Sequence, residues 1–531
     1  MKQYIYSWML LMSMTFGLTS CFDTVDDNPI IPDNPVIPDN PTDLSEYAIL
    51  YYAYGGGSLD IGLVPNMADF FKGKAESYNQ VKIAVQYKFS SEDDLKSYWI
   101  DDLLISNSIT QETADREWAK LKPMGQQTIR FIVDPTVGKP ADDVIVNEKY
   151  IYGQKNCDIA SVDSLTNFIN WATKACPAKH YVLVLADHGG GYMPHDDTTF
   201  AAQTRGLLYD IVSPNGPTHR FTASSLKYAL EHVNARMDVI YLDACLMNTV
   251  EYQFELKDVA DYLILSTFSV PGIGGSYSLL IDELATSDLE TALSNYNKGT
   301  VEKWDQMAAE YFAAGYTEYE WDYHDMTVTR TRNLDAFGEK FRVFVDKLVA
   351  AYADEGNKAK IDTITKYTFK VDSERPSYDL VDYAESITLA LPDVFDVAFS
   401  NELASAFNSC LVSQYCSDFL MKKGWSVDCS IMLAVKGNYY VYYSNNVDPS
   451  KIESYILFYA DGRREDYEYG NPEPINSIKW GSTLADTYEK LAFDKATGWS
   501  RWLYLNEQIP CENSPTQINS LFDDYGYIKV R

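Results

Sequence analysis

The stretch of sequence that decides the fold is YVLVLADHGGGY, residues 181–192. Its first six residues are apolar without alternation, and they lead directly into Asp187, His188 and three glycines. An unbroken apolar run of this length is typical of a strand that is buried on both faces, as in a parallel sheet. Glycines after such a strand let a ligand approach the backbone closely. The stretch therefore predicts a buried strand that carries a functional residue, His188, at its carboxyl end.

A second stretch of the same kind is VIYLDACLMN, residues 239–248, in which a buried strand leads into Cys245. A helix is predicted over residues 249–259, and a thiolate near a helix N-terminus is stabilised by the unpaired amides there. Because parallel strands present their carboxyl ends at one edge of a sheet, His188 and Cys245 are expected at the same edge. Taken singly, each has a simpler interpretation, since a cysteine after a strand is more often a small buried hydrophobic residue and a lone histidine is more often structural.

The same alternation of strand and helix runs through the first half of the chain. Further apolar runs lie at residues 47–52, 81–85, 129–133 and 262–265. Helical periodicity at residues 165–172 and 226–233 places amphipathic helices between such runs. This pattern predicts an α/β fold with a mostly parallel sheet flanked by helices.

From about residue 286 the pattern changes to that of a mixed α+β region. Helices are expected at residues 296–314 and 336–351. Strands are expected at residues 430–434, 439–443 and 455–459. A separate C-terminal region over residues 286–531 is therefore predicted.

Composition and charge limit the classes of function. The 531 residues carry a formal net charge of −32, from 44 Lys and Arg against 76 Asp and Glu. This balance argues against a nucleic-acid partner, because a phosphate-binding surface needs clustered Lys and Arg. Hydrophobic residues make up 46% of the chain, which is enough for a large core.

The N-terminus has the pattern of an export signal. Lys2 provides a positive start, and the apolar run from Trp8 to Leu18 is too short to span a bilayer. The run ends in LTSC at residues 18–21, which resembles a bacterial lipobox, in which the cysteine becomes the lipidated first residue. A secretory signal that happens to contain a cysteine is the alternative. We expect a signal peptide over residues 1–20 and a lipid on Cys21, which make the protein an outer-membrane lipoprotein, exposed at the surface and attached to the membrane through this lipid alone.

The residues after Cys21 predict a tether. Residues 21–44 are rich in Pro and Asp, and IPDNPV at 31–36 is nearly repeated as IPDNPT at 37–42. Proline at this density prevents helix and sheet and holds the chain in an extended, semi-rigid form. Such a segment would separate a folded domain from its lipid anchor.

Taken together, the two strand ends resemble the catalytic motifs of the clostripain family of cysteine peptidases. The matching segments are HGGGY at 188–192 and DACLM at 243–247. The resemblance continues in RGLLYD at 205–210, covers residues 45–280 well, and is thinner afterwards, up to a similar segment at 488–503. It implies a caspase-like catalytic domain over residues 45–285.

The resemblance also implies a mechanism, that of a cysteine endopeptidase acting on a peptide or protein. The Cys245 thiolate would attack the scissile carbonyl to form a thioester, and His188 would protonate the leaving amine and then activate water. The backbone N–H groups of Gly189 and Cys245 are the implied oxyanion donors. This chemistry requires no cofactor. Some members need calcium, but no EF-hand loop is present in the sequence.

The implied specificity is for Arg or Lys before the cleaved bond. Asp243 matches an acidic residue that in the family helps to bind a basic side chain, by charge-assisted hydrogen bonds. One segment departs from the family pattern, because PGIGG at 271–275 stands where members commonly have Pro-Gly-acid-Gly-Trp. Some members also cut themselves between the two motifs, where Arg205 and Arg220 are the basic candidates.

Two other functions stay open from the sequence. The 41 tyrosines and the aromatic, acidic run at residues 316–323 suggest a surface lipoprotein that binds glycans or peptides without catalysis. The altered residues 273–275 suggest a degenerate peptidase that serves as a scaffold, although His188 and Cys245 are both present.

Overall fold

The computed structural model describes most of the chain between residues 44 and 506. The described ranges are 44–135, 145–153, 155–192, 206–210, 219–313, 324–367, 377–418 and shorter pieces from 432 to 506. The predicted signal peptide, Cys21, the tether up to residue 43, Arg205 and the aromatic run at 316–323 lie outside the described residues.

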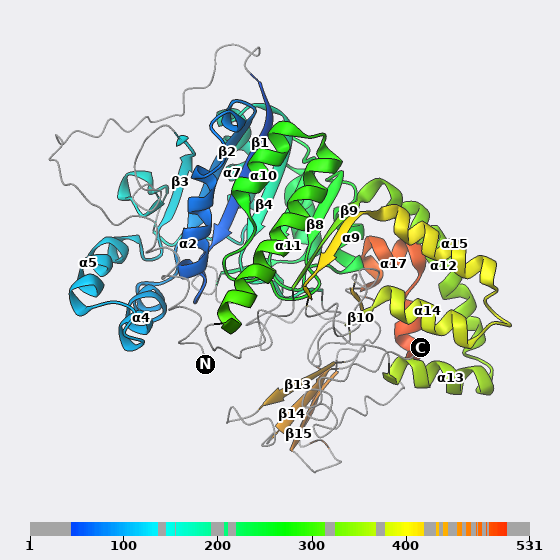
Figure 1. The fold of residues 1–531 in the computed structure, drawn as a ribbon. Helices are drawn as coiled ribbons and strands as arrows, with labels where there is room; N and C mark the ends of the chain where they lie inside the picture. The colour runs from blue at the N-terminus through cyan, green and yellow to red at the C-terminus, as the bar shows by residue number, and fades with distance from the viewer. Residues whose placement is uncertain are drawn as a thin grey trace.

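An eight-stranded sheet forms the centre of the molecule (Figure 1). Across the sheet, its strands are β11 (Leu411–Cys416), β9 (Asp325–Arg330), β8 (Tyr262–Leu265), β7 (Val239–Asp243), β4 (Ala178–Ala186), β1 (Ser45–Tyr54), β2 (Val81–Lys88) and β3 (Thr128–Ile132). The five strands from β8 to β2 are parallel, while β3, β9 and β11 pair in the antiparallel sense. The predicted mostly parallel sheet is therefore confirmed.

The strand β1 shows how both faces of this sheet are filled. Ile49 and Tyr51 belong to one hydrophobic core, whereas Leu50 and Tyr52 belong to another, because successive residues of a strand point to opposite faces. A strand buried on both faces needs apolar residues at every position, which explains the unbroken apolar runs.

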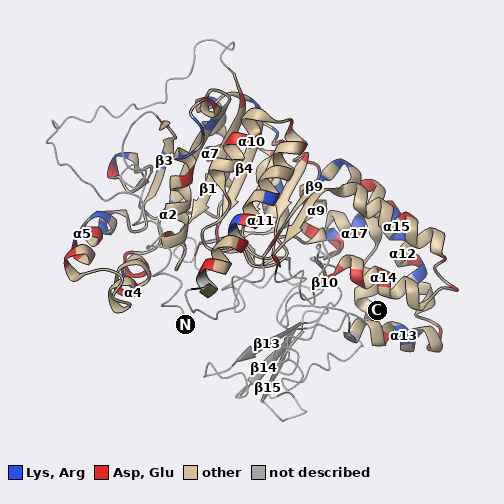
Figure 2. Ribbon diagram, in the orientation of Figure 1, with Lys and Arg blue, Asp and Glu red and all other residues tan. Residues whose placement is uncertain are grey.

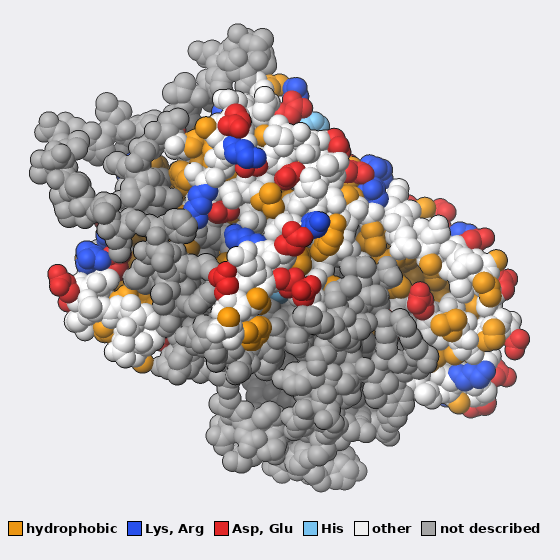
Figure 3. Space-filling view, in the orientation of Figure 1, with side chains coloured by type: hydrophobic (Ala, Val, Ile, Leu, Met, Phe, Trp, Pro, Cys, Tyr) orange, Lys and Arg blue, Asp and Glu red, His pale blue; other side chains and the backbone are white. Residues whose placement is uncertain are grey.

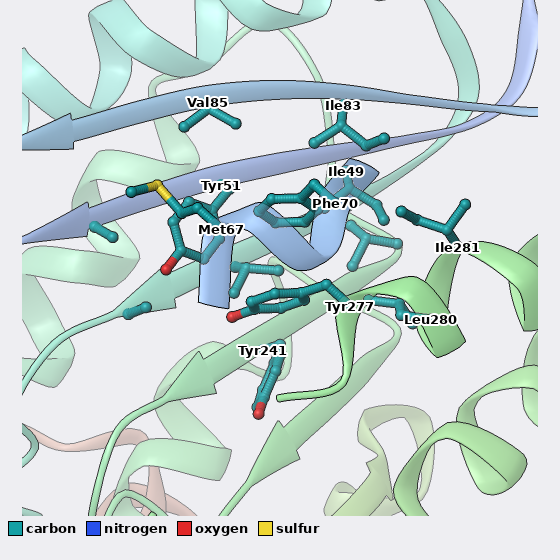
Figure 4. Packing of buried hydrophobic residues seen from close by; sticks show 14 of the residues in the cluster. Ile49, Tyr51, Met67, Phe70, Ile83, Val85, Tyr241, Tyr277, Leu280 and Ile281 are labelled. Carbon is teal, nitrogen blue, oxygen red and sulfur yellow. The ribbon is translucent and has the colours of Figure 1, made fainter. Parts of the chain in front are cut away.

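Helices cover each face. On the first face lie α2 (Asp60–Ala68), α10 (Tyr277–Thr286) and α11 (Leu289–Ala313). Figure 4 shows this core at close range, where the rings of Phe70 and Tyr277 stack with their centroids 4.5 Å apart beside Tyr51. On the second face lie α7 (Val162–Ala175), α8 (Ala223–Glu231) and α9 (Val250–Leu256).

The C-terminal region builds its own core beside the sheet (Figure 1). Its helices are α12 (Leu334–Ala351), α13 (Glu355–Tyr367), α14 (Leu380–Ala390), α15 (Val397–Cys410), α17 (Ala492–Thr497) and α18 (Ser500–Asn506). Its strands are β10 (Ser377–Asp379), which pairs with β12 (Met432–Ala434), and a sheet of β13 (Tyr439–Tyr443), β14 (Ser454–Phe458), β15 (Arg463–Glu468) and β16 (Asn476–Lys479). The strands β9 and β11 follow residue 285 in the chain but belong to the central sheet, so that sheet crosses the predicted boundary.

The surface carries charges of both signs. In Figure 2 the Lys and Arg residues of the described chain lie scattered among Asp and Glu. The face shown in Figure 3 has the same mixture over α10 and α11, with single hydrophobic side chains between the charges. None of the helices within the described ranges is long and apolar enough to span a bilayer.

Candidate active site

His188 and Cys245 leave neighbouring strands at matching positions. The strands β4 and β7 are parallel, and Ala186 pairs with Asp243 at their carboxyl ends. His188 and Cys245 each stand two residues beyond that pair, so both lie at the carboxyl edge of the sheet. This is the edge at which open α/β sheets place their functional sites.

Gly189 lies against the backbone of Cys245. A Cβ atom at this position would be 2.1 Å from the carbonyl oxygen of Cys245 and 2.8 Å from its nitrogen. Backbone atoms at these distances leave no room for a side chain, so the approach depends on glycine. The structure thus brings the HGGGY and DACLM segments into direct contact.

The strand β5 (Leu207–Asp210) holds the glycines that follow His188. The Gly190 N–H donates to the Gly206 carbonyl at 2.9 Å, and Gly189 forms an antiparallel bridge with Leu207. The donor in this pairing is Gly190, one residue beyond the amide predicted to hold the oxyanion. His188 is exposed, so solvent and a substrate can both reach it.

Cys245 sits on a tight turn that is held from a different part of the chain. Leu246 has a φ of 66°, in the left-handed region that side chains rarely adopt, and its N–H donates to the Phe268 carbonyl at 3.0 Å. The Val270 N–H points at the sulfur of Cys245, with 3.3 Å between nitrogen and sulfur. A donor at this distance stabilises negative charge on the sulfur. The thiol is partly exposed and thus accessible.

The helix predicted after Cys245 is shorter and starts later than expected. The helix α9 begins at Val250, and the side chain of its N-cap, Thr249, accepts the Tyr252 N–H at 3.2 Å. Three residues, 246–248, separate the cysteine from that cap. The N–H donor at the Cys245 sulfur therefore comes from Val270, and not from the N-terminus of α9 as the sequence predicts.

Asp243 is buried beneath the segment 271–277. Its carboxyl accepts hydrogen bonds from the Tyr241 hydroxyl at 3.0 Å, the Gly275 N–H at 3.0 Å and the Tyr277 hydroxyl at 2.5 Å. Burial raises the pKa of Asp243, while these three donors oppose the shift. The carboxyl supports this segment from below, and its contact with a substrate stays a prediction.

The space around Gly275 explains why the PGIGG segment departs from the family pattern. A Cβ atom at Gly275, where members commonly have Trp, would lie 2.1 Å from the Tyr296 hydroxyl and 2.9 Å from the Tyr241 hydroxyl. Two buried tyrosines thus fill the room that a larger residue would need. The segment is held further by Asn66, which donates to the Gly275 carbonyl at 2.9 Å, and by the Trp304 indole, which donates to the Gly274 carbonyl at 3.0 Å.

An ion pair between buried side chains fixes β5 to the sheet. The Lys88 ammonium lies 2.6 Å from the Asp210 carboxylate, and both side chains are 0% exposed. Lys88 also donates to the Asn156 side chain at 2.9 Å, and the Ile159 N–H donates to Asp210 at 3.2 Å. Burial lowers the pKa of Lys88 and raises the pKa of Asp210, but their mutual attraction opposes both shifts.

Arg220, one of the two predicted autocleavage sites, lies on a strand. It belongs to β6 (His219–Phe221), which pairs with β5 in a two-stranded sheet. Its side chain packs closely on Gly206, where a Cβ atom would lie 2.6 Å from the Arg220 Cδ. Cleavage there would require β6 to separate from β5.

The sequence profile of the clostripain family matches residues 132–501, which is more than half of the chain. This chain belongs to the clostripain family. It is therefore a cysteine-type peptidase, as the two motifs predicted. A comparison with curated proteins finds no match.

Two solved structures resemble this clostripain-family chain. One is a secreted C11 cysteine protease from Bacteroides thetaiotaomicron in complex with an irreversible peptide inhibitor, with a TM-score of 0.50 and 16% sequence identity. The other is a secreted C11 cysteine protease, "iotapain", from the same organism, with a TM-score of 0.51 and 15% identity. Each alignment covers 86% of this chain and 99% of the other. At such identity the likeness shows the shared fold.

The chemistry of a clostripain-family peptidase proceeds through a thiolate and requires no cofactor. Within the described ranges, no three His, Cys, Asp or Glu side chains are grouped so that they could hold a metal ion. A calcium requirement stays a prediction that binding measurements would test.

Sequence reasoning about this peptidase missed the residues that hold the site in place. Val270 contributes its backbone amide, which no side-chain motif reveals. Lys88 and Asp210 are 122 residues apart in the chain, and the only signal was the place of Asp210 in the RGLLYD block.

Proposed function

We propose that this peptidase cleaves peptide bonds through a Cys245 thioester, with His188 as its general acid and base. The observation that carries the proposal is the contact between Gly189 and the Cys245 backbone at the carboxyl edge of the sheet. It is supported by the exposure of His188 and by the Val270 N–H at the sulfur.

The first half-reaction forms the acyl-enzyme. The Cys245 thiolate attacks the scissile carbonyl carbon, and the oxyanion that develops is held by the backbone N–H groups of Gly189 and Cys245. Protonated His188 then gives its proton to the departing amine, the carbon–nitrogen bond breaks, and a thioester stays on Cys245.

The second half-reaction releases the acid. Neutral His188 takes a proton from water, which attacks the thioester carbonyl, and the oxyanion again occupies the same two amides. Collapse of this intermediate expels the Cys245 thiolate. The imidazolium and thiolate pair from which the reaction began is restored.

Cys245→Ala is expected to abolish hydrolysis of a peptide reporter while the fold, followed by circular dichroism, is unchanged. Cys157→Ala is the matched control, because Cys157 is also a partly exposed cysteine, but in a different part of the chain. That control should keep wild-type turnover. Full activity in Cys245→Ala would overturn the assignment of the nucleophile.

The expected preference is for Arg or Lys before the cleaved bond. It is supported by the match of Asp243 to the acidic residue of the family pattern and by the net charge of −32, which favours cationic substrates. A peptide-library cleavage profile, run with and without calcium, tests both the preference and the metal requirement. Cleavage spread evenly over neutral residues would contradict the preference.

Self-cleavage between the motifs is a separate proposal. It predicts two fragments of the wild-type chain on a denaturing gel and one intact chain for Cys245→Ala. Fragments that disappear in Arg205→Gln or in Arg220→Gln would identify the cut. A fully active wild-type enzyme that runs as a single chain would refute the proposal.

The location of the peptidase is proposed from its N-terminus. Residues 1–20 would direct export, and the lipid on Cys21 would anchor the tethered enzyme at the outer surface. Incorporation of labelled fatty acid in a bacterial host should be lost in Cys21→Ser and kept in Cys157→Ser. Label that persists in Cys21→Ser would contradict the anchor.

A further inference from the structure

The segment 266–270, which follows β8, carries the contacts that hold the nucleophile turn. Its Phe268 carbonyl accepts the N–H of Leu246, and its Ser266 carbonyl accepts the N–H of Asn248 at 2.9 Å. Its Val270 N–H points at the Cys245 sulfur. The position of the sulfur therefore depends on the position of this segment, which we call the support segment.

One carboxyl holds the support segment from the neighbouring strand. Asp325, the first residue of β9, accepts the N–H of Thr267 at 2.8 Å and the N–H of Phe268 at 2.9 Å, both on the same oxygen. Asp325 is 1% exposed. Two backbone donors on one buried oxygen fix the position of Phe268. The carbonyl of the same residue accepts the hydrogen bond from the Leu246 N–H.

Buried amide side chains extend this support under the turn. Asn248 donates to the Thr267 hydroxyl at 3.0 Å, and Gln253 of α9 donates to Asn248 at 2.7 Å. All three side chains are 0% exposed. A buried network of this kind fixes one arrangement, because each broken bond would leave a polar group without water to replace its partner.

We propose that Asp325 is a positioning residue for the nucleophile, which acts through the support segment to set the Leu246 turn and to aim the Val270 amide at the Cys245 sulfur. The proposal rests on Cys245 as the nucleophile. Asp325 does not touch the reacting atoms. It accepts hydrogen bonds from the Thr267 and Phe268 N–H groups, and these residues fix the segment that holds Cys245.

The acceptor oxygen of Asp325 serves this role in either protonation state. Burial raises the pKa of Asp325 to about 7, although the hydrogen bonds from Phe268 and Thr267 oppose that shift. A neutral carboxyl and a side-chain amide both offer one oxygen acceptor. Asp325→Asn can therefore keep the two backbone bonds, whereas Asp325→Ala cannot.

The test compares the wild type, Asp325→Ala and Asp325→Asn in the full-length enzyme. We expect Asp325→Ala to lower kcat by about tenfold or more with little change in KM, since the loss of buried hydrogen bonds weakens alignment of the thiolate rather than peptide binding. We expect Asp325→Asn to keep kcat within about threefold of the wild type.

A second readout follows the thiol itself. The rate of Cys245 alkylation by iodoacetamide, measured by mass spectrometry of the peptide that contains it, should fall in Asp325→Ala and recover in Asp325→Asn. Cys157 in the same sample is the internal reference. Because this rate requires no hydrolysis, it separates failure of this proposal from failure of the proposed function, which Cys245→Ala tests.

Asp379→Ala is the matched control for a purely structural role. Asp379 is 0% exposed and also accepts a backbone N–H, that of Asp382, but at the start of α14 in the C-terminal region. If Asp325→Ala does not fold, Asp325→Glu makes the same test, because it keeps the carboxylate but moves its oxygen by one methylene. The proposal would be overturned if Cys245 were alkylated as fast in the Asp325 variant as in Asp379→Ala and kcat were at least as high.

Discussion

At Gly189 a missing side chain allows two parts of the site to meet. Its backbone angle lies outside the left-handed region, so the reason for glycine is space and not conformation. The atoms that a Cβ would strike belong to the backbone of Cys245, which cannot rotate away as a side chain can. Position 189, directly after His188, therefore has to be glycine because the Cys245 backbone lies against it.

Asp60 illustrates how a single buried carboxyl makes stability depend on pH. It lies at the start of α2 and accepts hydrogen bonds from the Tyr87 hydroxyl at 2.6 Å and the Ser90 N–H at 3.2 Å. Burial raises the pKa of Asp60 to about 7, although Ser90 and Tyr87 oppose the shift. In the unfolded chain the pKa returns to about 4.

Between those two values the folded state keeps a proton that the unfolded state has lost. The free energy of unfolding should therefore fall as pH rises from about 4 to about 7, by up to about 1.4 kcal/mol per pH unit from this group. Asp60→Asn is neutral throughout and should make this slope shallower, as measured by urea unfolding at several pH values, although Asp325, whose pKa is also raised to about 7, still contributes to it. The exposed control Asp93→Asn should keep the wild-type slope. Equal slopes in both variants would show that Asp60 ionises normally.

At the scale of elements, a buried ion pair between Lys88 and Asp210 helps to hold β5 beside the glycines that follow His188. Lys88→Met would leave the Asp210 carboxylate buried without its cation, which is expected to destabilise the fold by about 3–5 kcal/mol. The double variant Lys88→Met, Asp210→Leu should recover part of that loss, because it removes the uncompensated charge. Urea unfolding of both variants measures the difference. A single variant as stable as the wild type would mean that the pair contributes nothing.

Strands with mostly apolar sequences could be predicted, including β3 at one edge of the sheet, whereas β9 and β11 at the other edge could not. The six apolar runs became β1, β2, β3, β4, β7 and β8. The strands β9, DMTVTR, and β11, LVSQYC, mix polar and apolar residues and were not expected in the sheet. The strand β11 is only partly buried at its edge, where a strand does not need apolar residues on both faces.

The same limit applies to the elements of the site. The two motifs are local in sequence, so the histidine and the cysteine could be predicted to meet at one edge. The support segment and Asp325 could not, because Asp325 is 58 residues beyond Thr267 and their contact depends on the antiparallel pairing of β8 with β9. A carboxyl at the start of an unpredicted strand carries no signal of its own.

At the scale of the whole molecule, α9 joins the sheet to the C-terminal region. Tyr252 and Leu256 pack in the core on the second face of the sheet, while Val250 and Phe254 pack in the C-terminal core. Charged side chains of the same helix contact residues 488–492 of the C-terminal region, since Glu251 accepts a hydrogen bond from the Tyr488 hydroxyl at 2.8 Å and Glu255 accepts one from the Ala492 N–H at 2.6 Å. Both cores therefore include side chains of α9, so neither core can stay fully packed if α9 unfolds.

This sharing predicts that the folded part of the chain unfolds in one transition. Phe254→Ala removes a ring that is 0% exposed and lies 5.1 Å from the ring of Phe493, so it should destabilise the protein by about 3–5 kcal/mol.

Calorimetry should then show a single peak that moves to lower temperature, because loss of packing on α9 weakens both cores together. Leu389→Ala, a change at an apolar residue that is 77% exposed, should leave the peak in place. Two separate peaks in the wild type, of which only one moves in Phe254→Ala, would mean that the catalytic sheet and the C-terminal region fold independently and that α9 couples them only weakly.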